Sequence, residues 1–210
     1  MNFRRTGSLM LVLILLFSLN AVPAHAGSLL EGQPRNRIFL GDSRTVGMYA
    51  TLYGKYSSSI DSQVGSEYWV AREGQGYRYM TGTAVPKAEA YGIDWTTDIY
   101  FLFGVNDLSN QAKYAEYISS KAAEWRWKGA HVYFVSVNPV YEGKCRSISN
   151  AAIEQFNAAM KQDLPYYVTY IDTYSNLVGS ISTEPSLTDS YGLHYKADTY
   201  RTIYRTMVGS

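Results

Sequence analysis

The chain has 210 residues, of which 19 are Lys or Arg and 18 are Asp or Glu, so its formal net charge at pH 7 is +1. A near-neutral chain offers no electrostatic basis for binding nucleic acid or an anionic membrane, and neither is expected as a partner. Cys145 is the single cysteine, which excludes an internal disulfide, so the stability must come from a hydrophobic core.

The N-terminus has the pattern of a secretory signal peptide. Arg4 and Arg5 form a basic region, residues 9–19 are almost all apolar, and Ala24 and Ala26 are small residues at the two positions that a signal peptidase reads. We expect cleavage after Ala26 and export to the medium or the cell surface, with no stable membrane insertion of the mature chain. An uncleaved anchor is the alternative, although the apolar stretch is short for a membrane span.

Residues 27–35 are interpreted as a short leader, and residues 36–210 as one domain long enough to bury a sizeable core. Short apolar runs alternate along this domain with segments of helical periodicity. The predicted strands are residues 37–40, 67–71, 98–103, 131–137 and 168–171.

Helices are predicted between these strands. Ser109 can cap one that extends to Trp125, Ser149 can cap the next, and a last amphipathic pattern runs from Tyr200 to Met207. Continuous apolar strands that alternate with helices predict a parallel sheet covered on both faces. Sheets of this kind bind ligands at the carboxyl ends of their strands.

Polar side chains follow two of the predicted strands at this carboxyl edge. Ser43 comes just after the first strand, and Asn106 and Asp107 come just after residues 98–103. Ser43 is either a nucleophile or part of a turn that starts a helix. Asn106 is equally typical of a turn, and Asp107 of a cap for the helix that begins near Ser109.

A serine hydroxyl becomes a nucleophile near neutral pH only with the help of a base. His131 opens a predicted strand at the opposite edge of the sheet, which favours a structural role. His194 lies in a loop that leads into the last helix and can reach the edge that carries Ser43. His194 is therefore the candidate base, whereas Cys145, as a rival nucleophile, has no histidine near it in the sequence.

Three segments together resemble the motif blocks of the SGNH hydrolase family, also called GDSL esterases. They are FLGDSRTVG near the start of the domain, FGVND in the middle and GLHY near the end, in the family's order over about residues 37–195. The resemblance implies an α/β fold, a three-layer α/β/α sandwich with a five-stranded parallel sheet. It also implies an acyl-enzyme mechanism that needs no cofactor and no metal.

The resemblance implies a role for each matching residue. Ser43 would be the nucleophile and His194 the general base. The oxyanion hole would consist of the backbone N–H of Ser43, the side-chain amide of Asn106 and one glycine N–H. Gly74 and Gly76 are both candidates for the glycine, and Gly76 is favoured. A tetrahedral intermediate requires several donors held where its negative charge develops.

The sequence departs from the family pattern at the acid, which usually stands three residues before the histidine. Tyr191 occupies that position, and Asp189 lies two residues further back. Either Asp189 reaches His194, which we expect, or a backbone carbonyl orients the ring in a Ser-His dyad. Arg44 follows the nucleophile directly and could bind an anionic or carbonyl-bearing substrate group, or pair with an acid such as Asp107.

These residues predict a secreted serine esterase that removes small acyl groups, acetyl above all, from a carbohydrate or a similar ester. One alternative is an O-acetyltransferase that passes the acyl group to a hydroxyl of a cell-wall or extracellular polysaccharide. Another is a non-catalytic binding module, favoured by Tyr191 in place of the acid and opposed by the intact Ser43, Asn106 and His194. The expected partner is a small ester or acylated carbohydrate, and the sequence predicts no oligomeric state.

Overall fold

The computed structural model describes residues 35–209. The predicted signal peptide, and all of the predicted leader except Arg35, lie outside these residues. Within the described part of the chain, no helix combines the length and the apolar character needed to cross a membrane.

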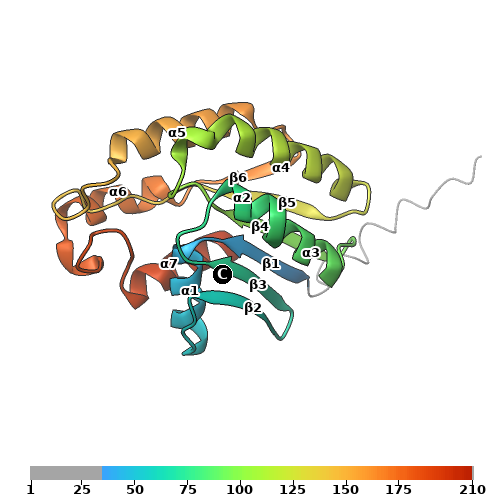
Figure 1. The fold of residues 1–210 in the computed structure, drawn as a ribbon, viewed down its shortest axis with the longest axis horizontal. Coiled ribbons are helices and arrows are strands. Elements are labelled where there is room, and N and C mark those ends of the chain that lie inside the picture. Colours follow the sequence, from blue (N-terminus) through green and yellow to red (C-terminus); the bar gives the residue numbers. More distant parts are fainter. Residues whose placement is uncertain (1–34, 210) are drawn as a thin grey trace, which may run out of the picture. The chain divides into compact units, whose positions relative to one another are not determined.

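A six-stranded sheet forms the middle layer, with the strands in the order β2-β3-β1-β4-β5-β6 (Figure 1). Five of the strands are parallel, whereas β2 pairs antiparallel with β3. The strands are β1 (Asn36–Gly41), β2 (Ser59–Val64), β3 (Glu67–Arg72), β4 (Thr97–Leu102), β5 (His131–Val135) and β6 (Val168–Ile171).

The predicted five-stranded parallel sheet is therefore correct for five strands and misses the sixth. The missed strand, β2, is at the edge of the sheet and has the sequence SIDSQV, in which Ile60 is the one buried side chain. An edge strand that faces solvent lacks the continuous apolar run that marks the buried parallel strands. Its pairing depends on the tight turn that leads into β3, where Gly65 has a φ of 59°.

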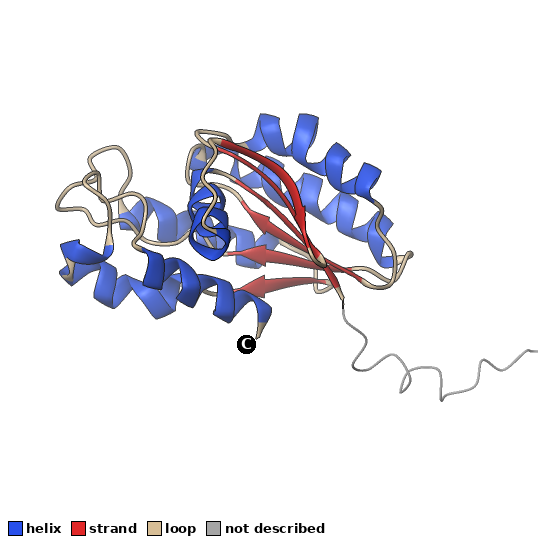
Figure 2. Cartoon of the chain, turned by 90° about the horizontal axis from the view of Figure 1, so that it is seen from below, coloured by secondary structure: helices blue, strands red, loops and turns tan. Residues whose placement is uncertain are grey.

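Helices cover both faces of the sheet, which gives the predicted three layers (Figure 2). Side chains alternate along each strand, so Ile38 and Leu40 face one layer of helices and Phe39 faces the other. One layer contains α3, α4 and α5, and the other contains α1, α6 and α7. The helices are α1 (Ser43–Tyr53), α2 (Tyr77–Tyr79), α3 (Val85–Tyr91), α4 (Gln111–Arg126), α5 (Asn150–Asp163), α6 (Tyr174–Thr183) and α7 (Ala197–Val208).

The predicted caps agree with the structure in one case and differ in another. The hydroxyl of Ser149 accepts a hydrogen bond from the N–H of Ala152, 3.2 Å away, and so caps α5 as expected. Helix α4 begins only at Gln111, after a 3₁₀ turn over Leu108–Asn110 that contains Ser109. The polar turn after β4 therefore delays the start of α4 beyond the position that the pattern indicates.

The turn from β1 into α1 sets the position of Ser43. Asp42 is the N-cap of α1, and its Oδ1 accepts the N–H of Arg44 at 2.9 Å. The side chain is only 2% exposed, and this burial raises the pKa of Asp42 to about 6, although the nearby Arg44 acts in the opposite direction. Ser43 is thereby held as the first residue of α1, at the carboxyl end of β1.

We predict that Asp42→Asn changes the pH dependence of stability. The folded protein holds the Asp42 proton up to about pH 6, whereas an unfolded chain releases it near pH 4. The free energy of unfolding of the wild type should therefore fall as the pH rises through this window, by roughly 2–3 kcal/mol from this group. Asparagine keeps the cap acceptor and carries no charge. Relative to the wild type, the free energy of unfolding of the variant, measured with urea, should increase between pH 4 and pH 6 and stay higher at pH 8. Equal dependence of the two free energies on pH would contradict the prediction.

Helix α1 packs closely against α7, the helix that follows the His194 loop. A Cβ atom added at Gly47 would lie 2.6 Å from Cζ of Tyr200, whose side chain is only 4% exposed and has no room to move away. Glycine at this position lets the two helices approach each other. The packing thereby sets the distance between the start of α1 and the loop before α7.

We predict that Gly47→Ala destabilises the fold. Overpacking typically costs about 1–3 kcal/mol, which exceeds the roughly 1 kcal/mol that alanine gains over glycine in a helix. The control is Gly179→Ala in α6, where the added Cβ meets nothing within 4 Å. Thermal unfolding should show a lower Tm for Gly47→Ala and an equal or higher Tm for the control. An equal gain in both variants would show that α1 and α7 are not closely packed.

Candidate active site

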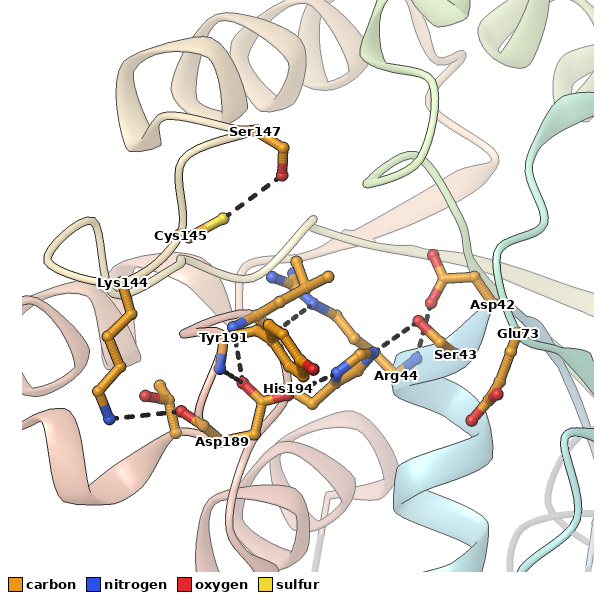
Figure 3. Close-up of polar contacts among 12 residues, drawn as sticks. Asp42, Ser43, Arg44, Glu73, Lys144, Cys145, Ser147, Asp189, Tyr191 and His194 are labelled. Atoms are coloured by element: carbon orange, nitrogen blue, oxygen red, sulfur yellow. Dashed lines mark hydrogen bonds and ion pairs between the residues drawn. The ribbon is translucent and has the colours of Figure 1, made fainter.

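Ser43, His194 and Asp189 form a hydrogen-bonded line at the carboxyl edge of the sheet (Figure 3). The Oγ of Ser43 lies 2.9 Å from Nε2 of His194, and Nδ1 of the same ring lies 2.9 Å from Oδ2 of Asp189. Ser43 comes from the start of α1, whereas the other two residues come from the loop between Leu187 and α7. Segments about 150 residues apart in the sequence therefore meet at one site.

The five-residue separation between Asp189 and His194 is accommodated by a tight turn. The N–H of Asp189 donates to the carbonyl of His194 at 2.9 Å, and the N–H of Gly192 donates back to the carbonyl of Asp189 at 3.2 Å. Gly192 has a φ of 70°, which glycine adopts without strain. The side chain of Tyr191, which occupies the family's acid position, is 74% exposed.

The carboxylate of Asp189 is held in its charged form. Its Oδ1 accepts the N–H groups of Tyr191 at 3.1 Å and Leu193 at 3.0 Å, while Oδ2 faces the His194 ring. Burial alone would raise the pKa of Asp189, but the hydrogen bonds from His194 and from the N–H of Leu193 lower it below its usual value. A carboxylate is therefore available to fix the ring and to balance a charge on it.

The segments that carry the predicted oxyanion donors are joined to each other. The side-chain amide of Asn106 donates one hydrogen bond to the carbonyl of Gln75 at 2.8 Å, and its second N–H has no acceptor among the described residues. Within residues 35–209, the N–H of Gly76 has no hydrogen-bond acceptor. A Cβ at Gly76 would lie 2.5 Å from Oδ1 of Asp107, so the close approach of this side chain requires glycine. A Cβ at Gly74 would meet open space, and glycine is favoured there by a φ of 66° instead.

Asp107 connects the loop after β3 to the loop after β4, a role that the sequence did not indicate. Its Oδ2 accepts the N–H of Tyr77 at 2.8 Å and the side-chain amide of Asn110 at 3.0 Å, and its Oδ1 accepts the hydroxyl of Tyr114 at 2.6 Å. Asp107 precedes the 3₁₀ turn over Leu108–Asn110, but its side chain accepts no backbone N–H of that turn, so the expected cap does not form. Tyr77 is 30 residues away in the chain, and nothing in a local pattern could identify it as the partner.

Arg44 takes neither of the two roles that the sequence left open. Its side chain is buried, and its guanidinium donates hydrogen bonds to backbone carbonyls of two loops. Asp107 is occupied by the partners described above. Arg44 therefore belongs to the framework beneath the site and not to its open face.

Two further candidate residues make no hydrogen bond to Ser43 or His194 in the part of the chain that the structure describes. Nδ1 of His131 is 3.3 Å from Oδ1 of Asp98 at the amino edge of the sheet, in agreement with a structural role. Cys145 is buried, and its Sγ lies 3.7 Å from Oγ of Ser147 (Figure 3). Across the described residues, no group of three or more His, Cys, Asp or Glu side chains is arranged to hold a metal ion.

The sequence matches no protein-family model and no curated protein. Solved structures with similar folds include the acetylxylan esterase Axe2 of Geobacillus stearothermophilus, at 14% identity and a TM-score of 0.58, covering 82% of this chain and 92% of that chain. The C-terminal catalytic domain of the peptidoglycan O-acetyltransferase OatA of Streptococcus pneumoniae is similar at 14% identity and a TM-score of 0.57, covering 83% and 91%.

A lipase/acylhydrolase from Enterococcus faecalis is similar at 15% identity and a TM-score of 0.56, with 83% of this chain and 94% of that chain covered. At these identities the similarity concerns the fold. The chain has the α/β fold of SGNH-type esterases and acylhydrolases, with a mixed central sheet between layers of helices.

Proposed function

We propose that the protein is a secreted serine esterase of the SGNH family that removes small acyl groups, acetyl above all, from a carbohydrate or a similar ester. The observation that carries the proposal is the line of hydrogen bonds from Asp189 through His194 to Ser43. A carboxylate, an imidazole and a hydroxyl in this order form the arrangement that activates a serine for acyl transfer.

In the first half of the reaction, Oγ of Ser43 attacks the ester carbonyl, and Nε2 of His194 takes the hydroxyl proton. Asp189 holds the ring through Nδ1 and stabilises the imidazolium that forms. The negative charge on the former carbonyl oxygen is met by the N–H of Ser43, the N–H of Gly76 and the second amide N–H of Asn106. His194 then returns the proton to the alcohol oxygen as the ester bond breaks.

In the second half, the acyl group leaves Ser43. His194 removes a proton from a water molecule, which attacks the acyl carbonyl, and a second tetrahedral intermediate forms in the same oxyanion hole. Its collapse gives the proton back to Oγ of Ser43 and releases the carboxylic acid. No cofactor or metal takes part in this sequence.

Asp189 is the acid of the proposed triad, and Tyr191 has no part in the chemistry. The hydrogen bond between Asp189 and His194 supports a triad over a Ser-His dyad that relies on a backbone carbonyl. It also removes the main argument for a non-catalytic binding module, which was the absence of an acid at position 191. The lowered pKa of Asp189 supports the same reading, because an ionised partner is what an imidazolium needs.

The acetyl preference and the choice of acceptor draw on the solved structures with the same fold, which include an acetylxylan esterase and a peptidoglycan O-acetyltransferase domain. The second of these favours an O-acetyltransferase as the alternative function. The acyl-enzyme would be the same, and a sugar hydroxyl would replace water. Release of acetate from an acetylated oligosaccharide supports hydrolysis, whereas movement of the acetyl group onto an added sugar acceptor supports transfer. Secretion rests on the signal-peptide pattern of the first 26 residues.

We expect Ser43 to be the residue that is acylated. A fluorophosphonate probe should modify the purified mature chain at Ser43, as located by mass spectrometry, and Ser43→Ala should abolish both labelling and the hydrolysis of an aryl acetate. Ser109→Ala, at an exposed serine that follows β4, should behave as the wild type. An adduct at another residue, or full turnover by Ser43→Ala, would refute the mechanism.

We expect Asp189→Ala to lower kcat for the aryl acetate by about 10⁴-fold, the usual loss when the acid of a serine triad is removed. Tyr191→Phe is the matched control. It removes the hydroxyl of an exposed ring and keeps the N–H that donates to Asp189, so its kcat should stay near that of the wild type. A kinetically silent Asp189→Ala would leave the Ser-His dyad as the mechanism.

A further inference from the structure

The loop that carries Asp189 and His194 is held from inside and from outside. Inside, the Asp189 carboxylate accepts two N–H groups of its own loop. Outside, the carbonyl of Leu193 accepts Nε of Arg44 at 3.1 Å, and the carbonyl of Gly192 accepts the N–H of Tyr141 at 2.9 Å. The acid and the base are five positions apart here and three apart in the family pattern, so this loop has more conformational freedom to lose. The contacts from outside the loop restrict that freedom.

Arg44 joins three segments of the chain. It is the second residue of α1, directly after Ser43. Its Nη1 donates to the carbonyl of Asn138 at 2.6 Å and its Nη2 to that of Pro139 at 3.3 Å, both in the segment after β5. The guanidinium carbon also lies 5.1 Å from the centre of the Tyr195 ring. One side chain therefore connects the nucleophile helix, the segment after β5 and the His194 loop.

The turn over residues 141–145 closes on the same loop from the other side. A Cβ at Gly192 would lie 2.5 Å from the carbonyl oxygen of Tyr141 and 3.0 Å from the nitrogen of Cys145. This turn therefore fits only around a glycine, and it leaves the loop little space in which to shift. Arg44 holds the start of the segment that leads into this turn, through the carbonyls of Asn138 and Pro139.

We propose that Arg44 is a positioning residue of the esterase reaction. Acting through the carbonyl of Leu193, it keeps the ring of His194 at hydrogen-bond distance from Ser43. The inference rests on the proposed function. Its physical basis is the planar guanidinium, whose fixed fork reaches three carbonyls at once, which the single ammonium of lysine cannot do with the same geometry. A misplacement of about 1 Å at a reacting group can cost on the order of 100-fold in rate.

The test compares Arg44→Lys with the wild type on an aryl acetate. The charge stays and the fork is lost, so kcat should fall by about 10- to 100-fold. KM should change little, because the guanidinium is buried and its donors are directed at three backbone carbonyls. The rate of fluorophosphonate labelling at Ser43 should fall by a similar factor. Arg37→Lys is the matched control. It makes the same substitution at the opposite edge of the sheet, near the amino end of β1, where Nη1 of Arg37 lies 3.4 Å from Oε1 of Glu67, and its kcat should not change.

Gly192→Ala disturbs the same loop through its contact with the turn over residues 141–145. It is the variant to use if circular dichroism and Tm show that Arg44→Lys folds poorly. It should also lower kcat with little change in KM. In the double variant the two losses should not multiply, because both act through the position of His194. The positioning role would be overturned if Arg44→Lys kept the wild-type kcat or changed only KM. It would also be overturned if the losses in kcat multiplied in the double variant. Each of these outcomes would leave the esterase proposal intact. A wild type that is neither labelled nor active would overturn both.

Discussion

The backbone pairing of β1 with both of its neighbours is the constraint on which the rest of the site depends. Gly41, the last residue of β1, is paired with Ala71 of β3 and Leu102 of β4, so three parallel strands end side by side. Every loop that follows them must leave from the same edge. The Asp42–Ser43 turn, the Gly76 segment and the Asn106 turn are neighbours for this reason, although about 30 residues separate each from the next.

Charged side chains at this edge hold backbone groups in place. Asp42 accepts an N–H at the start of α1, Asp107 joins the loops after β3 and β4, and Arg44 donates to three carbonyls. Asp42 and Arg44 are buried and Asp107 is partly buried, and each side chain is hydrogen-bonded to backbone groups of a loop or a helix start, as buried polar groups require. The framework beneath the Ser43–His194 pair is therefore polar, while the two faces of the sheet behind it are packed with apolar and aromatic side chains.

Hydrogen bonds from tyrosine hydroxyls to carboxylates connect several helices to the rest of the fold. The chain has 20 tyrosines. Tyr53 of α1 and Tyr204 of α7 both donate to the buried carboxylate of Glu67 on β3, which brings together the helices on either side of the candidate site. Tyr114 of α4 donates to Asp107 in the same way. A hydroxyl on an aromatic ring can pack in the core and still satisfy a carboxylate, which suits a chain that has no disulfide.

The amino-acid pattern alone predicts the five parallel strands, the edge at which a site would lie, and Ser43, Asn106 and His194 as candidates for that site. These follow from apolar runs and short motifs, which are local and therefore readable along the chain. Three features were decided only by the tertiary structure: the edge strand β2, the hydrogen bond between Asp189 and His194, and the three carbonyls bound by Arg44. A half-exposed strand has little apolar signal, and the conformation of a loop depends on what packs against it. The contacts of Arg44 span up to 149 residues, and such partners exist only once the sheet has brought the loops together.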